Sequence, residues 1–203
     1  MRPRPAAGRL LALAAVALAL AGALALAGCD GAQSGGAKSG EGGAENVVEA
    51  QYSPVENLER IDVATIAQAR HSIDMAAYVL SDFAVIDALK AAQARGVAVR
   101  IVLDRTQHHA WPQLVDLAPA IRIKPSRVFM HLKSYVVDGT TLRAGAANFS
   151  ASGLKRQDND LVLIRDAAAV RTFQADYERL WREGVAPSPA DQAAKAFGAD
   201  EAD

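Results

Sequence analysis

Apolar residues along the middle of this chain recur with two different spacings. Three stretches carry them at helical intervals, which predicts helices at residues 54–70, 83–96 and 167–184. Shorter apolar or alternating runs predict β-strands at residues 72–80, 97–104, 121–124, 127–137, 141–147 and 160–166. Pro112 and Pro119 limit any helix between residues 108 and 120, so we expect an irregular segment or a broken helix there.

The order of these elements predicts the fold class. Strands alternating with helices indicate an α/β fold, with a mixed, mostly parallel sheet flanked by helices in one domain. The strand–helix–strand unit at residues 72–104 should be parallel and right-handed. The sequence "DGT", residues 138–140, marks a turn between two neighbouring strands. We expect the folded domain to span residues 47–184.

The two ends of the chain differ in composition from this domain. Residues 1–28 begin with three arginines and no acid and continue as an uncharged Leu/Ala/Val/Gly run, an order typical of an export signal. An uncleaved membrane anchor is the alternative interpretation. Residues 29–46 are rich in Gly, Ala and Ser, which predicts a flexible tether. Residues 185–203 lack a repeating apolar face, which predicts a disordered tail.

The apolar leader ends at "LAGC", and its cysteine, Cys29, is the only one in the chain. This tetrapeptide resembles the bacterial lipobox, in which the cysteine becomes the lipidated N-terminus after cleavage. We therefore predict lipidation at Cys29 and an exported, membrane-anchored lipoprotein that faces the periplasm. Because there is no second cysteine, disulfide bonds play no part in the fold.

The charge of the chain restricts its class of partner. The chain holds 22 basic and 23 acidic residues, and because three of the basic ones lie in the leader, the remainder carries a formal charge of −4. Proteins that bind nucleic acid through a broadly positive surface have an excess of basic over acidic residues, which this chain lacks. Any phosphate recognition would therefore have to come from a local basic groove near the motif described below. The alternative is that the cations there form an ordinary solvated surface. The candidates for a basic groove are Arg122, Lys124, Arg127, Lys155 and Arg156.

A polar motif interrupts the strand expected just before the "DGT" turn. Side chains alternate along a strand, so His131 and Lys133 share one face, whereas Asp138 ends the strand with the opposite parity. An edge strand with a solvated polar face is the ordinary explanation of a lone His-x-Lys pair. Here, however, the segment "GAANFS" follows Asp138 within ten residues and adds Asn148 and Ser150.

The combined pattern resembles the phospholipase D superfamily. His131, Lys133 and Asp138 fit H-x-K-x-x-x-x-D, and "GAANFS" fits the glycine-small-x-Asn-x-Ser/Thr segment that follows it in that family. The resemblance covers nearly all of residues 50–182. It extends in particular to short bacterial exported endonucleases with one motif and to mitochondrial cardiolipin hydrolase-like proteins. It implies a phospholipase D-like catalytic domain.

Two positions depart from the family pattern. Ala146 stands where the family usually has a serine whose hydroxyl donates to a phosphate. Asn159 stands where a downstream glutamate orients the catalytic histidine, with Asp158 and Asp160 beside it. Of these three residues the chemistry favours Asp160, because a carboxylate partner raises the basicity of His131.

The resemblance implies displacement at a phosphodiester through a covalent phosphohistidine at His131. An imidazole with a pKa of about 6.5 is a competent nucleophile at neutral pH without a metal. Lys133 and Asn148 would hold the phosphoryl oxygens that gain charge, with Ser150 in support. The parity of Asp138 and its place before a glycine favour a structural or turn role. No cofactor is implied, and no His/Cys/Asp/Glu cluster in the sequence has metal-ligand spacing.

The leaving alkoxide needs a second proton-handling group, and the chain has one motif and no internal repeat. His71 lies at a helix-to-strand junction, which favours a structural or surface role. His108 and His109 follow a buried strand at its C-terminal end, where α/β sites often form. Contact with substrate is one interpretation of them, and we favour the other, a solvated loop pair. The resemblance implies a different answer, a homodimer in which each His131 serves with its twofold copy, one as nucleophile and one as acid.

Three functions remain open at this point. The first is a metal-independent, non-specific endonuclease that acts on DNA or RNA at the membrane. The alternative is phospholipase D-type hydrolysis of phospholipid head groups, which a lipid anchor would favour. The third, from another class, is a phosphate-binding lipoprotein without turnover, and the intact set of His131, Lys133 and Asn148 argues against it.

Replacing Cys29 with serine should abolish lipidation, because the thiol that carries the lipid is removed. The wild type should incorporate labelled fatty acid and sediment with membranes, whereas Cys29→Ser should do neither. Unchanged labelling and membrane retention in the variant would reject the lipoprotein interpretation.

Overall fold

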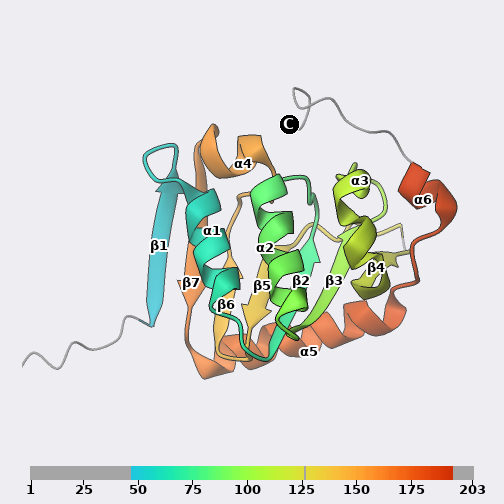
Figure 1. The fold of residues 1–203 in the computed structure, drawn as a ribbon. Coiled ribbons are helices and arrows are strands. Elements are labelled where there is room, and N and C mark those ends of the chain that lie inside the picture. The colour runs from blue at the N-terminus through green and yellow to red at the C-terminus, as the bar shows by residue number, and fades with distance from the viewer. Residues whose placement is uncertain (1–46, 126, 194–203) are drawn as a thin grey trace, which may run out of the picture. The chain divides into compact units, whose positions relative to one another are not determined.

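The computed structural model of the protein describes residues 47–125 and 127–193; the expected leader, the tether and Cys29 lie outside the described residues. One seven-stranded sheet, in the order β1-β7-β6-β5-β2-β3-β4, carries helices on both faces (Figure 1). The strands are β1 (Val48–Ser53), β2 (Ser72–Ala77), β3 (Ala98–Asp104), β4 (Ile121–Lys124), β5 (Lys133–Val137), β6 (Thr141–Ala144) and β7 (Asn159–Ile164). The helices are α1 (Leu58–Ala67), α2 (Phe83–Ala94), α3 (Trp111–Leu114), the 3-10 helix η1 (Val115–Ala120), α4 (Ala151–Lys155), α5 (Ala167–Glu183) and α6 (Pro189–Ala193).

The mixed sheet flanked by helices is the predicted fold class, but the sheet is not mostly parallel. β2 pairs in parallel with β3, as predicted, and β3 with β4. The pairings β1–β7, β2–β5, β5–β6 and β6–β7 are antiparallel. Between β5 and β6 the connection is the turn at residues 138–140, and such a tight turn joins only antiparallel strands, since parallel neighbours need a crossover of a dozen or more residues.

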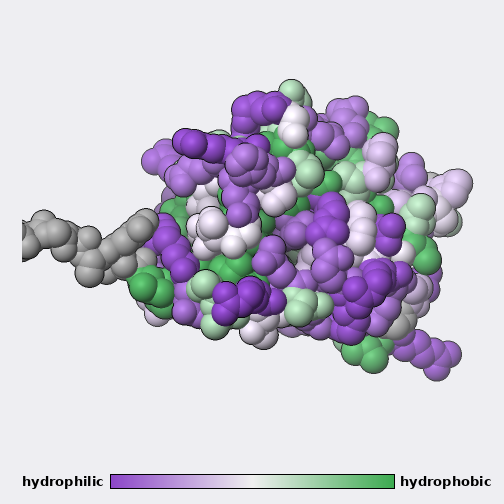
Figure 2. Space-filling view, turned by 90° about the horizontal axis from the view of Figure 1, so that it is seen from below, coloured by the Kyte–Doolittle hydropathy of each residue, from purple (hydrophilic) through white to green (hydrophobic). Residues whose placement is uncertain are grey.

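Successive side chains of the central strands pack into two separate apolar layers. Met75 of β2 belongs to the larger cluster, together with Leu58 of α1. The next residue, Ala76, belongs to a cluster with Tyr177 of α5. Alternation along the strand therefore places α1 and α2 on one face of the sheet and α5 on the other, as Figure 1 shows. Seen from below in Figure 2, the surface is mostly hydrophilic, with hydrophobic residues in small separate patches.

Side-chain caps set the starts of the long helices. Asn57, Asp82 and Asp166 each accept the backbone N–H three residues later, at 3.1, 3.1 and 2.8 Å. Because Asn57 is the cap, α1 begins after it and not at Pro54, where a helix start was expected. The expected broken helix at residues 108–120 contains α3 and η1. Within the described ranges, no helix is long and apolar enough to cross a membrane.

The sequence did not predict β1, α4 or α6. β1 reverses the pattern of a core strand, since its apolar Val48 and Tyr52 are exposed while Glu49 and Gln51 are half-buried. The expected disordered tail at residues 185–203 needs a partial correction. Its first residue, Val185, forms an antiparallel bridge with Ile123, and α6 follows. The remainder, residues 194–203, lies outside the described residues.

Asp138 closes the turn after β5 at the end of the sheet opposite Lys133. Its backbone has a positive φ of 51°. Its carboxylate accepts the backbone N–H groups of Arg70, His71 and Ser72 at 2.9, 2.7 and 2.9 Å. Burial raises the pKa of Asp138, but these three donors outweigh it and the pKa is lowered overall. The aspartate of the motif thus ties the end of β5 to the start of β2.

Asp138→Asn should reduce the free energy of unfolding by an amount on the order of 1 kcal/mol at neutral pH, because the amide offers weaker acceptance to three N–H groups. Asparagine tolerates a positive φ, so the backbone is not strained. A lowered folded pKa contributes stability above the unfolded value of about 3.9 and loses it as pH falls through the folded value. Urea denaturation should therefore show a constant difference at neutral pH that shrinks below about pH 4. A difference independent of pH would contradict the ionic explanation.

Candidate active site

His131 lies in the loop between β4 and β5, and the strand predicted here begins only two residues after it. Two side chains hold this loop. Asp104, at the end of β3, accepts the backbone N–H of Met130 at 2.7 Å, and Lys124 Nζ donates to the carbonyl of Val128 at 3.1 Å. These two side chains bond to backbone groups that a neighbouring strand would otherwise pair with, so they hold this part of the loop although it is not a strand. His131 itself is exposed.

The side chains of His131 and Lys133 meet. Lys133 Nζ lies 3.2 Å from Nδ1 and 3.1 Å from Nε2 of the His131 ring, and it donates to the His131 carbonyl at 3.0 Å. An ammonium at nearly equal distance from both ring nitrogens lies over the face of the ring. The contact therefore leaves the lone-pair or N–H direction of each nitrogen, which lies in the ring plane, open. Burial, followed by the positive charge of Arg143, lowers the pKa of Lys133.

Tyr78, just after β2, is a site residue that the sequence analysis did not identify. Its ring centroid lies 4.3 Å from that of His131 at an interplanar angle of 64°, and Lys133 Nζ lies 4.7 Å from the same centroid. The phenol ring therefore confines the imidazole by an edge-to-face contact. One available signal was its position after a buried parallel strand, since α/β sites form at the carboxyl ends of such strands.

The stretch after β2 also joins the two halves of the motif. The backbone N–H of Tyr78 donates to the carbonyl of Leu132 at 2.8 Å, and that of Ser81 donates to the carbonyl of Phe149 at 2.8 Å. His131 and Asn148 are the sequence neighbours of these two acceptors. The two halves therefore converge at the end of the sheet where β5 begins and β6 ends.

The "GAANFS" segment is a loop held by the backbone and side chain of one residue, Asp160. Gly145 has a φ of +133°, and a Cβ there would lie 2.5 Å from the Asp160 carbonyl oxygen, so only glycine fits. Ala147 N–H donates to that carbonyl at 3.2 Å, and Ala146 N–H donates to Asp160 Oδ1 at 2.9 Å. Asn148 Oδ1 is buried and has no hydrogen-bond partner in the part of the chain that the structure describes. A buried acceptor left in this way lacks a donor within the described part of the chain.

The three remaining supporting residues hold this loop and the helix after it. Asp160 was expected to orient His131, but its carboxylate accepts a hydrogen bond from the loop instead. Its strand, β7, is separated from β5 by β6. Asn159 Nδ2 donates to the carbonyl of Gly153 at 3.0 Å. Ser150 Oγ accepts the Gly153 N–H at 3.1 Å and caps α4. Among the residues that the structure describes, Lys133 and Tyr78 contact the imidazole with their side chains.

The other histidines differ sharply in exposure. His109 is buried, which corrects the expectation of a solvated loop residue. Its Nδ1 accepts the backbone N–H of Leu80 at 3.3 Å, and its Nε2 lies 2.8 Å from the carbonyl oxygen of Asp104. Burial lowers the pKa of His109 to about 4. His71 and His108 are exposed.

The expected basic groove is only partly present. Three of its five cations are held by other groups: Arg122 by Trp181, Lys124 by Val128 and Lys155 by Glu59. Arg127 and Arg156 are exposed.

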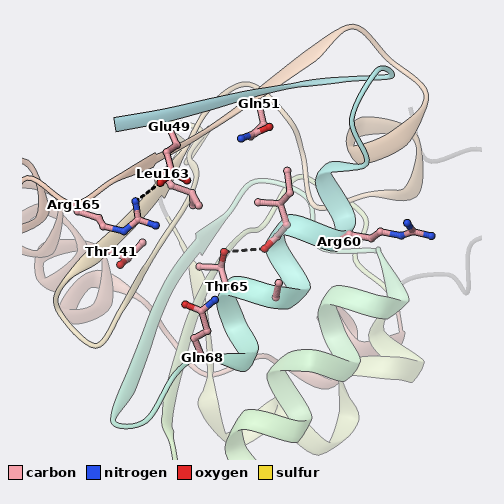
Figure 3. Close-up of a pocket in the computed structure, with 10 residues that line it drawn as sticks. Glu49, Gln51, Arg60, Thr65, Gln68, Thr141, Leu163 and Arg165 are labelled. Atoms are coloured by element: carbon pink, nitrogen blue, oxygen red, sulfur yellow. Dashed lines mark hydrogen bonds and ion pairs between the residues drawn. The ribbon is translucent and has the colours of Figure 1, made fainter. Parts of the chain in front are cut away.

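No group of three or more His, Cys, Asp and Glu side chains within the described residues could hold a metal ion. A hollow of about 430 Å³ lies away from the motif, between α1 and the strands β1, β6 and β7 (Figure 3). In it Arg165 pairs with Glu49 at 2.7 Å. The lining residues are Glu49, Gln51, Arg60, Ile61, Ala64, Thr65, Gln68, Thr141, Leu163 and Arg165. None of them belongs to the predicted site.

Comparisons with curated proteins agree with the motif. Phospholipase D of Rickettsia prowazekii is 32% identical over 126 residues, which covers 60% of this chain and 62% of that protein. Mitochondrial cardiolipin hydrolase of Xenopus tropicalis is 26% identical over 122 residues, which covers 58% of each chain. The chain thus spans about three-fifths of the length of these curated relatives.

Solved structures and family models agree with the fold. A phospholipase D family member, Nuc from Salmonella typhimurium, has a TM-score of 0.63 at 26% identity, covering 68% of this chain and 95% of that one. A family model described as "Cardiolipin synthase, PLD-like domain" matches residues 63–181, more than half of the chain and all of the motif. The chain therefore belongs to this phospholipase D-like family.

Proposed function

We propose that this protein is a phosphodiesterase in which His131 is the nucleophile. One observation carries the proposal: an exposed imidazole with the Lys133 ammonium 3.1–3.2 Å from both ring nitrogens. In the proposed reaction a ring nitrogen of His131 forms a bond to phosphorus as the bond to the leaving oxygen breaks. The leaving oxygen takes a proton from an acid, and water then hydrolyses the phosphohistidine.

The residues around His131 fit the charge changes of that reaction. Negative charge grows on the phosphoryl oxygens, and Lys133 can donate to an oxygen of the phosphorus that His131 attacks. Asn148 adds an amide whose Nδ2 group can donate to a phosphoryl oxygen, while its Oδ1 has no partner among the described residues. Neither step needs a metal ion or a cofactor in this scheme.

The acid comes, in this proposal, from His131 of a second copy of the chain. His109 is a poor candidate within one chain, because it is buried and its pKa is lowered to about 4. Two apolar side chains precede His131, Val128 at 72% and Phe129 at 61% exposure. A twofold partner would cover apolar surface beside the site, which supports a homodimer with paired imidazoles.

Nucleic acid is the substrate class that we propose first. Its support is the resemblance to short exported endonucleases, together with the exposed Arg127 and Arg156, which can contact backbone phosphates. Phospholipid is the second candidate. The names of the curated relatives, phospholipase D and cardiolipin hydrolase, support it. We further propose that a lipid on Cys29 holds the domain at the periplasmic face of a membrane.

Purified protein should cleave a phosphodiester in excess EDTA, because the proposed nucleophile and its charge partner are protein side chains. The substrates to compare are plasmid DNA, single-stranded DNA, RNA, cardiolipin and phosphatidylcholine. His131→Asn should abolish activity, and Lys133→Met should reduce it by on the order of 10²–10³. His108→Asn, at an exposed histidine, is the matched control and should leave the rate unchanged. Complete loss of activity in EDTA with rescue by a divalent ion would reject the mechanism.

Mixing wild type with His131→Asn tests the shared site. A mixed dimer has one imidazole where the reaction needs two, so it should be nearly inactive. Random pairing of equal amounts should leave about one quarter of wild-type activity instead of about one half, since only dimers of two wild-type chains are complete. The measurement is the specific activity of co-expressed chains, with the oligomeric state from light scattering. Activity proportional to the wild-type fraction, in a monomer, would exclude the dimeric site.

A further inference from the structure

Arg143 is a charged side chain in the middle of the apolar layer between α1 and the sheet. It lies on β6 and is 0% exposed, as is its partner Asp62 of α1. Nε and Nη2 of Arg143 donate to Oδ1 and Oδ2 of Asp62 at 3.0 and 3.1 Å, which makes the pair bidentate. The hydroxyl of Tyr135, on β5, donates to Asp62 Oδ1 at 2.9 Å. The guanidinium is therefore held in one orientation.

The remaining nitrogen of Arg143 bonds to both halves of the motif. Nη1 donates to the carbonyl of Lys133 at 2.6 Å and to the carbonyl of Ala147 at 3.2 Å. The ladder between β5 and β6 stops at the pair Tyr135–Arg143, because β6 ends one residue later. The guanidinium thus replaces a missing strand partner for Lys133 and also anchors the loop that leads into Asn148.

Stability alone does not explain a charge pair at this position. Taking two charges out of water costs about as much as their attraction returns, and apolar pairs of similar volume are often equally stable. An apolar pair, however, would leave the carbonyls of Lys133 and Ala147 without their donor. What Arg143 and Asp62 supply beyond packing is a fixed N–H group between these two carbonyls.

We infer that Arg143, held by Asp62, is a positioning residue that sets Lys133 and Asn148 at the separation needed to bind one phosphoryl group. This inference rests on the proposed function for its catalytic meaning. Among the described residues, no hydrogen bond to Oδ1 fixes the side chain of Asn148. The position of the amide therefore depends on the backbone that carries it. A displacement of about 1 Å at such a group costs on the order of 10²-fold in rate.

A charge-free double variant, Asp62→Asn with Arg143→Met, separates positioning from stability. Arg143→Met alone leaves the Asp62 carboxylate buried without its cation, so it should be strongly destabilised. The double variant removes both charges and keeps an acceptor for Tyr135, so it should recover most of the free energy of unfolding. Its kcat should nevertheless stay about 10²-fold below wild type, because Lys133 and Ala147 have lost their common donor. Recovery of kcat together with stability would overturn the inference.

Arg143→Lys keeps the buried charge and serves as a second variant if the double variant does not fold. One ammonium carries three donors on a single nitrogen and cannot reproduce the planar fork of arginine. Its kcat should lie between those of the wild type and the double variant. A kcat equal to that of the wild type would show that the fork is not needed for positioning.

The matched control is a second arginine–aspartate pair on the other face of the sheet. Arg100 donates to both carboxylate oxygens of Asp74 at 2.7 and 2.9 Å and packs against Tyr177 of α5. Arg100→Met with Asp74→Asn should alter stability without altering kcat. A fall in kcat equal to that of the Asp62/Arg143 double variant would mean that any loss of stability slows the enzyme, and would overturn the inference.

Calorimetric titration with inorganic phosphate tests positioning without turnover. Loss of one well-placed charge-assisted hydrogen bond should weaken phosphate binding by about tenfold in the Asp62/Arg143 double variant. If the wild type turns over no phosphodiester but binds phosphate and the double variant binds it less, the proposed function fails and the positioning role stands. Equal turnover and equal phosphate affinity in the two proteins retain the function and reject the positioning role. A wild type with neither turnover nor phosphate binding rejects both.

Discussion

The bidentate pair of Arg143 and Asp62 is the interaction on which the arrangement of the motif depends. Both residues are fully buried, so every donor and acceptor must find a partner inside the protein. The partners lie on four different parts of the chain: α1, β5, β6 and the loop after β6. A helix on one face of the sheet is thereby locked to the two backbone segments that carry Lys133 and Asn148.

The family motif is contiguous in sequence, but the fold divides it between the two ends of β5. Lys133 begins this strand, two residues after His131, and Asp138 follows its last residue, roughly 17 Å away for five residues of extended chain. Asp138 accepts three backbone N–H groups at the start of β2 and fixes the register of the two central strands. The spacing in H-x-K-x-x-x-x-D therefore corresponds to the length of one strand, with the candidate catalytic residues at one end and an anchoring carboxylate at the other.

Local pattern was enough to predict the α/β class, the parallel unit from β2 to β3 and the neighbouring side chains of His131 and Lys133, since each depends on periodicity within a short segment. The features that local pattern did not predict depend on which strands and side chains meet in the folded protein. β1 carries its apolar residues outward, so alternation did not indicate its buried face. Asp160 was assigned to His131 by charge, yet strand order places β6 between them. The sequence does hold one signal for the buried pair. An arginine inside the apolar strand "TLRA" needs an acidic partner if it is buried, and the helical segment "ERIDVATIA" contains acidic residues.

The site combines groups of local and of distant origin, and this division follows from what each group must do. A nucleophile and the cation that meets the same phosphoryl group must lie close together. The last loop residues and the first residue of β5 satisfy this directly, with Lys133 Nζ 3.1 Å from His131 Nε2. The amide of Asn148 must approach the same phosphorus from another side, and a strand cannot supply two such directions. It therefore comes from a loop beyond a second strand, and the buried guanidinium of Arg143 joins that loop to β5.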